Sequence, residues 1–248
     1  MSQLLDTIRE ILHYLRQYKG RTAMTMFGLV WGTMTVIVLL AFGVGVEKQM
    51  SKNMHGMGEG IAICWPGRTS IPFAGYGRDR RIRLTEADTE LLRREIHEIQ
   101  RISPEFSRWG VAVRFGDQIN RPKVTGILPE YGPMRNIWPE PGGRWLNDLD
   151  ILCRRRVAFI GSNLRDLLYG KQADVIGQYV YIEQIPFLII GVMKDKTQNS
   201  SYGSRDRDMV FLPYTTFKSV FGHTYVDNFV YQIADLRLGE AVRSQVYT

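Results

Sequence analysis

The longest apolar stretch of the chain runs from Thr22 to Val46 and contains no charged residue. As an α-helix, this stretch would be roughly 37 Å long at about 1.5 Å per residue, enough to cross a hydrocarbon core of about 30 Å with some tilt. A cleaved secretory signal is the alternative, because the stretch lies near the N-terminus. Such a signal has an apolar region of only about 7–15 residues. The pattern therefore favours a retained transmembrane helix over residues 21–47.

The residues before this stretch have an amphipathic pattern. Apolar side chains recur at helical spacing and polar or charged residues fill the other positions, which predicts a helix over residues 1–20. The apolar positions are Leu4, Leu5, Ile8, Ile11, Leu12, Leu15 and Tyr18. Two roles are open for this helix. It could lie in the headgroup plane as an anchor, or it could dock a partner, with Ile8, Ile11 and Leu15 contacting a membrane helix or an ATPase subunit.

The charges beside the span predict its orientation. Arg16, Lys19 and Arg21 precede it, whereas Glu47 offsets Lys48 just after it. Because basic residues accumulate on the cytoplasmic side, the N-terminus is expected in the cytoplasm and residues 48–248 outside. That outer region is long enough for one sizeable domain or two small ones.

Within the span, Gly28 and Gly32 form a GxxxG pattern, which allows two helices to approach closely. One such pattern is a weak signal. Thr25, Thr33 and Thr35 add further small or hydroxyl-bearing positions. This composition favours a helix that packs against other membrane helices, with Gly28 and Gly32 at the contact.

Beyond residue 48 the apolar runs are short and alternate between strand and helix patterns. Thr85 and Asp88 form a capping box for the first helix, and Ser162 or Asn163 is expected to cap the second. Leu188 lies in the most apolar strand. The sequence therefore predicts a mixed α/β (α+β) domain. Its strands are expected over residues 61–65, 111–115, 123–128, 157–160, 179–183, 187–192, 209–212 and 229–234, and its helices over 84–99, 162–170, 215–221 and 240–246. The strands 179–183 and 187–192 are expected to form a hairpin, and a turn at 116–117 is expected to lead from the strand 111–115 to the strand 123–128.

Charge and cysteine content narrow the function classes. The chain has 32 Lys and Arg against 25 Asp and Glu, a formal net charge of +7, but the two signs are interspersed and no basic helix carries base-stacking aromatics. Nucleic acid is therefore not an expected partner. The basic groups at 78–83 and 154–156 are interpreted as a solvated loop and a solvated strand start, with contact to anionic lipid or an acidic protein as the alternative. Cys64 and Cys153 could pair outside the cell, although two separate buried thiols are favoured.

The sequence carries no recognisable catalytic motif. It has no GxxxxGK[ST], and His97-Glu98 lacks the second His of a zinc helix. Ser162 is not flanked by the glycines of a nucleophile elbow, so it is interpreted as a helix cap. Asp148 and Asp150 are interpreted as solvated loop ends. We expect no catalytic residue, no cofactor and no metal ion, so any ATP hydrolysis belongs to a partner.

A series of short motifs, in consistent order along nearly the whole chain, resembles the MacB-type permease of ABC transporters, specifically its first transmembrane helix and periplasmic core domain. After the basic amphipathic helix and the Gly-rich span, the motifs are Trp65-Pro66-Gly67, Leu84-Thr85-Glu86-Ala87-Asp88, Ile102-Ser103-Pro104, Val124-Thr125-Gly126-Ile127-Leu128-Pro129-Glu130-Tyr131, Gly143-Arg144-Trp145-Leu146, Val157-Ala158-Phe159-Ile160-Gly161, Leu168-Tyr169-Gly170, Ile176-Gly177-Gln178, Phe187-Leu188-Ile189-Ile190-Gly191-Val192 and Val210-Phe211-Leu212-Pro213.

The resemblance implies a periplasmic domain, residues 48–248, with a porter-like α/β part and a β-rich part. It implies a permease of the inner membrane that forms a homo- or heterodimer, is driven by a P-loop ATPase subunit, and has a periplasmic adaptor protein among its partners. The family has three further membrane helices after this domain, whereas this chain ends at Thr248, so it would be the N-terminal portion of a permease. The alternative function is a membrane-anchored interaction or signalling module without transport.

Overall fold

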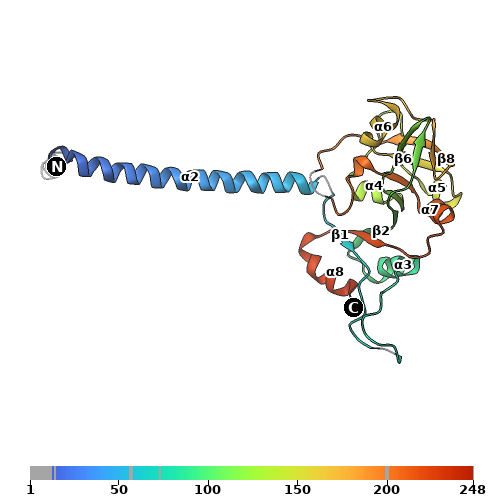
Figure 1. Ribbon diagram of the computed structural model, residues 1–248. Coiled ribbons are helices and arrows are strands. Elements are labelled where there is room, and N and C mark those ends of the chain that lie inside the picture. The colour runs from blue at the N-terminus through green and yellow to red at the C-terminus, as the bar shows by residue number, and fades with distance from the viewer. Residues whose placement is uncertain (1–12, 14, 56–57, 73, 199–200, 248) are drawn as a thin grey trace. The chain divides into compact units, whose positions relative to one another are not determined.

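The computed structural model describes residue 13 and residues 15–55, 58–72, 74–198 and 201–247. The chain divides into two units, residues 1–52 and 53–248. The first unit is dominated by the long helix α2 (Lys19–His55), and the second, which we call the sheet domain, carries the strands (Figure 1).

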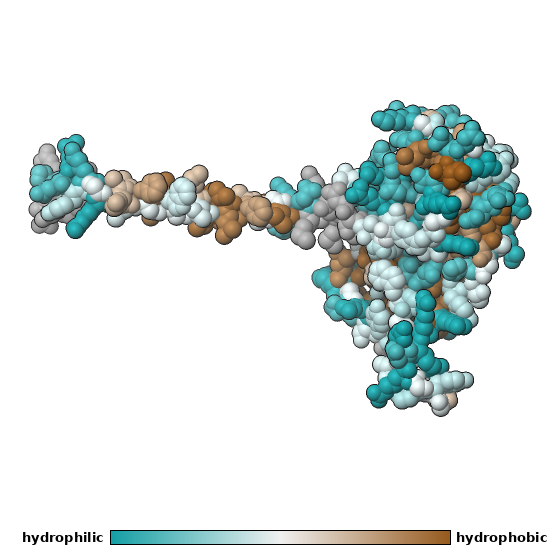
Figure 2. Space-filling model, in the orientation of Figure 1, coloured by the Kyte–Doolittle hydropathy of each residue, from teal (hydrophilic) through white to brown (hydrophobic). Residues whose placement is uncertain are grey.

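The apolar N-terminal helix predicted from the sequence is confirmed. The segment Lys19–Gln49 has a window of mean hydropathy 2.2, and none of that window is buried inside the protein. Figure 2 shows apolar residues along the middle of this helix, whereas the visible face of the sheet domain is mostly polar. Because no protein covers these side chains, lipid is the surrounding that suits them.

The strands of the sheet domain form one continuous sheet in the order β1-β10-β2-β5-β9-β6-β8-β7-β3-β4. Neighbours are antiparallel except for the pairs β5–β9 and β6–β8, which are parallel. The mixed α/β class is therefore confirmed. The strands are β1 (Ile61–Cys64), β2 (Ile99–Arg108), β3 (Val113–Phe115), β4 (Gln118–Asn120), β5 (Val124–Ile127), β6 (Val157–Ile160), β7 (Tyr179–Ile182), β8 (Ile185–Val192), β9 (Val210–Pro213) and β10 (Asn228–Ile233).

Strand β2 joins two parts of the sheet. Its first half, up to Glu105, pairs with β10, and its last residues, from Phe106, pair with β5. Pro104 lies in the half that pairs with β10 alone, where one side of the strand needs no backbone donor, which explains why a proline is tolerated there. β2 is thus the shared strand between a small part, β1-β10-β2, and a large part that runs from β5 to β4.

Both faces of the central strands β5, β6 and β9 are buried, which explains why these strands are largely apolar. Along β9, Val210 and Leu212 pack into one core and Phe211 into the other. The first core is covered by α3 (Glu86–Glu95), α6 (Ser162–Tyr169), α7 (Tyr214–Phe221) and α8 (Gly239–Val246), and the second by α4 (Tyr131–Met134) and the segment 137–146. The remaining helices are α5 (Asp148–Leu152) and the 3-10 turns η1 (Asp206–Asp208) and η2 (Leu236–Leu238).

Helix α7 lies unusually close to β5. A Cβ added to Gly126 would come within 2.5 Å of the Cβ of Phe217, so only glycine fits there. Gly222 ends the helix in the left-handed conformation, at φ 65°, as a C-terminal glycine typically does.

Several sequence predictions are confirmed. Asp88 accepts a hydrogen bond of 2.7 Å from the backbone amide of Thr85, as the capping box requires. The predicted hairpin is formed by β7 and β8, whose register leaves Glu183 and Gln184 as a two-residue turn. Both turn residues have positive φ, 47° and 67°, which is the backbone of a type I′ turn without the usual Asn or Gly.

Other predictions are wrong. The first helix ends at Glu95 rather than Ile99, because Ile99 begins β2, a strand that was not predicted. The turn at 116–117 leads to β4 and not to 123–128, which pairs instead with β2 and β9 as β5. Helix α6 is capped by Gly161 rather than by the side chain of Ser162 or Asn163. Cys64 and Cys153 are separate free thiols as favoured, but Cys153 is exposed.

Strand β8 offers a direct test of this core. Ile189 is fully buried, whereas Leu188, which the sequence placed in the most apolar strand, is only half-buried. Ile189→Ala should lower the free energy of unfolding by about 2–5 kcal/mol, because the cavity it leaves cannot refill. Leu188→Ala, which removes side-chain atoms from the other face of the same strand, should cost clearly less. Chemical denaturation of the full chain in neutral detergent, followed by near-UV circular dichroism, measures both. An equal or larger loss at Leu188 would contradict the assigned faces.

Candidate functional site

The predicted contact residues of the membrane helix are open. No atom lies within 4 Å of a Cβ added to Gly28 or to Gly32, so a second helix has free access to both positions. Ile8 and Ile11 lie outside the described residues, and Leu15 has 43% of its surface exposed. The contact role of these five residues stays a prediction.

The threonines of this helix use their hydroxyls within the helix. Thr33 donates to the carbonyl of Leu29 at 2.9 Å, and Thr35 donates to that of Trp31 at 2.8 Å. Such bonds satisfy a polar group in a medium without water. What the threonines offer a partner helix is therefore small size rather than a free donor.

In the sheet domain, the carboxylate of Glu105 on β2 is fully buried. Its Oε1 accepts from Lys123 Nζ at 2.7 Å, and its Oε2 accepts from the Tyr202 hydroxyl at 2.6 Å and from Asn228 Nδ2 at 2.9 Å. Lys123 directly precedes β5, and Asn228 begins β10. The carboxylate therefore ties β10, β2 and β5 together at the point where β2 changes partner.

A second buried ion pair adjoins the first. Tyr131 and Tyr202 share a hydroxyl–hydroxyl hydrogen bond of 2.7 Å. Burial and the nearby charge of Glu105 raise the pKa of both, while the charge of Arg135 opposes the shift. The guanidinium of Arg135 lies 4.7 Å from the ring centre of Tyr202 and donates to Asp206 at 2.9 Å. Lys196 also pairs with Asp206, at 2.7 Å. Burial lowers the pKa of Lys196, while the charge of Asp206 opposes that shift.

These three ion pairs, which we call the ionic network, together with the Tyr202–Glu105 hydrogen bond hold the described residues of the polar stretch 194–208, residues 194–198 and 201–208, against the sheet. Both oxygens of Glu105 are occupied, so its carboxylate is not free to accept a proton from a substrate. The arrangement is suited to fixing the junction of the two sheet parts rather than to catalysis. Sequence reasoning missed it, because neither Glu105 nor Asp206 belongs to a recognisable motif, and only the fold brings them near Lys123 and Arg135.

Asp150 is also placed differently from the prediction. It is fully buried, not a solvated loop end, and its carboxylate accepts from both terminal nitrogens of Arg144, at 2.6 and 3.0 Å. Burial acts to raise the pKa of Asp150, but hydrogen bonds from Arg144 and from the Asn147 backbone outweigh it, and the pKa lies below its usual value. Asp150 also caps α5, together with Asn147.

The remaining chemical candidates have structural partners. Ser162 donates to the carboxylate of Asp195, so its hydroxyl is neither a cap nor paired with a histidine base. Within the described residues, no group of three or more His, Cys, Asp or Glu is placed to hold a metal ion. The 78–83 basic group forms one side of an arm, described over residues 67–72 and 74–83, in which the backbone amide of Thr69 donates to the carbonyl of Arg80 at 2.9 Å. In the second basic group, residues 154–156, Arg155 forms an ion pair with Asp150, at 3.6 Å.

Comparison with known proteins relates this arrangement to a family. Residues 22–247 match the MacB-like periplasmic core domain. The chain is 30% identical over 247 residues to the macrolide export ATP-binding/permease protein MacB of Azoarcus sp., an alignment that covers 99% of this chain and 36% of the relative. It is 32% identical over 215 residues to the pyoverdine export ATP-binding/permease protein PvdT of Pseudomonas syringae pv. tomato, covering 86% of this chain and 31% of the relative. The chain thus spans about a third of the length of these curated relatives.

Two solved structures share the fold. The periplasmic region of MacB from Actinobacillus actinomycetemcomitans superposes with a TM-score of 0.59 at 20% identity, over 79% of this chain and 89% of that one. The extracellular domain of the noncanonic ABC-type transporter YknZ from Gram-positive bacteria gives a TM-score of 0.57 at 16% identity, over 73% of this chain and 88% of that one. At these identities the likeness concerns the fold alone.

The ionic network can be tested by removing one charge. Lys123→Ala leaves the carboxylate of Glu105 buried without its cation, which should lower the free energy of unfolding by about 3–5 kcal/mol. Arg94→Ala is the matched control, because it removes one partner of an ion pair, Arg94–Glu95, whose side chains are 73% and 61% exposed. That change should cost about 0–1 kcal/mol. Thermal and chemical unfolding of the full chain measure both, and similar losses in the two variants would argue against a structural role for the network.

Proposed function

Because the chain belongs to the family of the MacB-like periplasmic core domain, we propose that it is the N-terminal part of the permease of an ABC transporter. The observation that carries this proposal is the continuity of the matched region. It begins at residue 22, inside the apolar helix, and runs to residue 247 at the end of α8. A membrane helix is therefore followed in one chain by the domain that this family places in the periplasm.

In this role the chain couples ATP hydrolysis by a partner to movement of the sheet domain. The relatives are named as ATP-binding/permease proteins, which supports an ATPase acting with this chain. Only residues 56–60 separate α2 from β1 in the sequence, and five residues can span at most about 18 Å. A large displacement of the end of α2 must therefore pull on β1, which pairs with β10 along its whole length.

The partners follow from the surfaces of the helix. The open Gly28 and Gly32 suit close packing against a helix of a second permease, identical or different. The amphipathic segment before the span would contact the ATPase subunit, and the sheet domain would face a periplasmic adaptor. Substrate would be exported across, or extracted from, the inner membrane. The relatives are named for macrolide and pyoverdine export, and we assign neither substrate to this chain.

The proposed orientation places the N-terminus in the cytoplasm and the sheet domain in the periplasm, and the two cysteines test it. Cys153 is exposed, whereas Cys64 is buried and burial raises the pKa of its thiol, so Cys153 should react far faster with a maleimide. A membrane-impermeant maleimide admitted to the periplasm of intact cells should label the protein, and Cys153→Ser should abolish that labelling. Labelling of Cys153 only in inverted vesicles would reverse the orientation.

The coupling role is tested at the amphipathic segment. Ile8→Asp together with Ile11→Asp places two charges on its apolar stripe, which should abolish ATPase stimulation in the purified membrane complex if that stripe is packed. The matched control is His13→Asp with Gln17→Asp, which places the same charges on the opposite face and should leave stimulation intact. Unfolding of the sheet domain should be unchanged in both variants. Undiminished stimulation in the Ile8 and Ile11 variant would leave the segment only a role at the lipid surface.

A further inference from the structure

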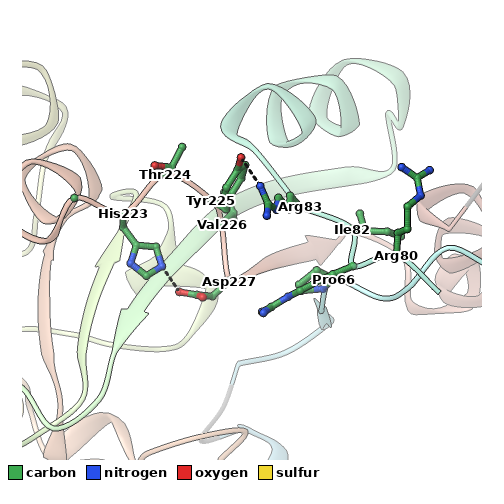
Figure 3. A pocket seen from close by; sticks show the side chains of 11 residues that line it. Pro66, Arg80, Ile82, Arg83, His223, Thr224, Tyr225, Val226 and Asp227 are labelled. Carbon is green, nitrogen blue, oxygen red and sulfur yellow. Dashed lines mark hydrogen bonds and ion pairs between the residues drawn. The ribbon is translucent and has the colours of Figure 1, made fainter. Parts of the chain in front are cut away.

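A cleft outside the ionic network collects guanidinium groups that have no acidic partner. Its walls are the base of the arm, residues 80–83, and the segment 222–227 that precedes β10 (Figure 3). Within the part of the chain that the structure describes, none of Arg80, Arg81 and Arg83 forms an ion pair, whereas Arg68 on the same arm is paired with Asp79 at 3.0 Å. The cleft therefore has an excess of positive charge that the fold does not neutralise.

Among the described residues that line the cleft, the single carboxylate, that of Asp227, is already engaged. Asp227 accepts a hydrogen bond of 2.7 Å from the backbone amide of Ser107, and His223 Nε2 lies 3.4 Å from the same carboxylate. Figure 3 shows His223 and Asp227 together, apart from Arg83 and Tyr225. The Asp227 carboxylate is thus directed towards Ser107 on β2 and towards His223, and it does not pair with the arginines.

The two walls are held in a defined arrangement. The amide of Val226 donates to the carbonyl of Leu84 at 2.9 Å, which joins the segment 222–227 to the residues just after the arm. Next to this bond, Arg83 donates to the Tyr225 hydroxyl at 3.1 Å, and its guanidinium lies 4.9 Å from the centre of that ring. Arg83 is therefore positioned before any ligand arrives, with further N–H donors available for an anion.

An aromatic cavity continues from this cleft. The cleft and the second cavity have volumes of about 1050 and 320 Å³, and both are lined by Pro66, Arg81 and Asp227. The second cavity is also lined by Trp65 and Trp109, whose side chains are 50% and 61% exposed, and it borders Lys123 and Tyr202 of the ionic network. Exposed tryptophan rings next to unpaired guanidinium groups provide flat apolar surfaces beside an anion-binding edge.

From this arrangement we propose that the cleft binds a small anion in which a phosphate or carboxylate is attached to a flat apolar ring. The guanidinium groups of Arg81 and Arg83 hold the anionic group, because their planar donors match two oxygens at once. The ring packs against the aromatic side chains of the adjoining cavity. The site lies in the sheet domain and does not depend on the transport role proposed above.

Calorimetric titration of the full chain in neutral detergent with phenyl phosphate tests this site. Phenyl phosphate should bind with a Kd at least about tenfold lower than that of inorganic phosphate, which lacks the ring, or of phenyl glucoside, which lacks the charge. It should also bind more tightly than dihexanoylphosphatidylglycerol, a lipid headgroup without a ring. Equal affinity for phenyl phosphate and any of these three compounds would overturn the proposal.

Matched variants locate the binding. Arg83→Ala and Arg81→Ala should each raise the Kd for phenyl phosphate about tenfold or more. The control is Arg114→Ala, because the guanidinium of Arg114, on β3, lies 4.9 Å from the ring centre of Tyr181, the same distance as that between Arg83 and the ring centre of Tyr225. Likewise Trp109→Ala should weaken binding, whereas Trp138→Ala, at another tryptophan that is 53% exposed, should not. Equal losses in a control and its test variant would overturn the assigned site.

Discussion

The buried carboxylate of Glu105 is the constraint on which the sheet domain depends. It lies on the last residue of β2 that pairs with β10, directly before the first that pairs with β5. Its oxygens bind Lys123 beside β5 and Asn228 on β10, and Tyr202 from the polar stretch covers it. A buried charge is costly unless all its partners are present, so this site penalises any arrangement in which the two sheet parts separate. The role of the Glu105 site is therefore to specify one arrangement of the two sheet parts, because a buried ion pair often adds no stability over apolar residues of similar volume.

The topology gives that junction mechanical importance. β1 follows the membrane helix in the sequence, and β10 precedes α8 at the other end of the sheet domain, yet the two strands are neighbours. Entry to and exit from the domain are therefore at one edge of the sheet, and within the sheet β2 joins that edge to the large part. In the proposed coupling role, a displacement of β1 would reach the large part through β10, β2 and the ionic network. The proposed coupling role requires such a rigid path, because a domain that unfolded locally would dissipate the movement.

Much of the local structure was predictable, and the errors have identifiable causes. The capping box of Thr85 and Asp88 and the β7–β8 hairpin depend on neighbouring residues, and they formed as predicted. β2 was missed, because Ser103 and Pro104 are unusual inside a strand, and only the one-sided pairing of that half makes Pro104 acceptable. Ser162 was assigned as a cap, but the residue before it, Gly161, takes that position, and the hydroxyl bonds to Asp195 instead. That contact joins residues far apart in the sequence, so no local pattern announces it.

The sequence by itself determined the membrane helix, the mixed α/β class and the order of motifs that relates the chain to its family, because length, periodicity and turn chemistry are local properties. Tertiary structure alone decided which polar residues became functional candidates. Glu105 and Lys123 are 18 residues apart and Arg135 and Asp206 are 71 apart, and each pair meets only after the sheet has assembled. The same holds for the arginine cleft, where residues 80–83 meet the segment 222–227. Charge was visible in the sequence, but which charges are paired, buried or left free depends on the fold, since electrostatic energy is set by distance and burial rather than by position along the chain.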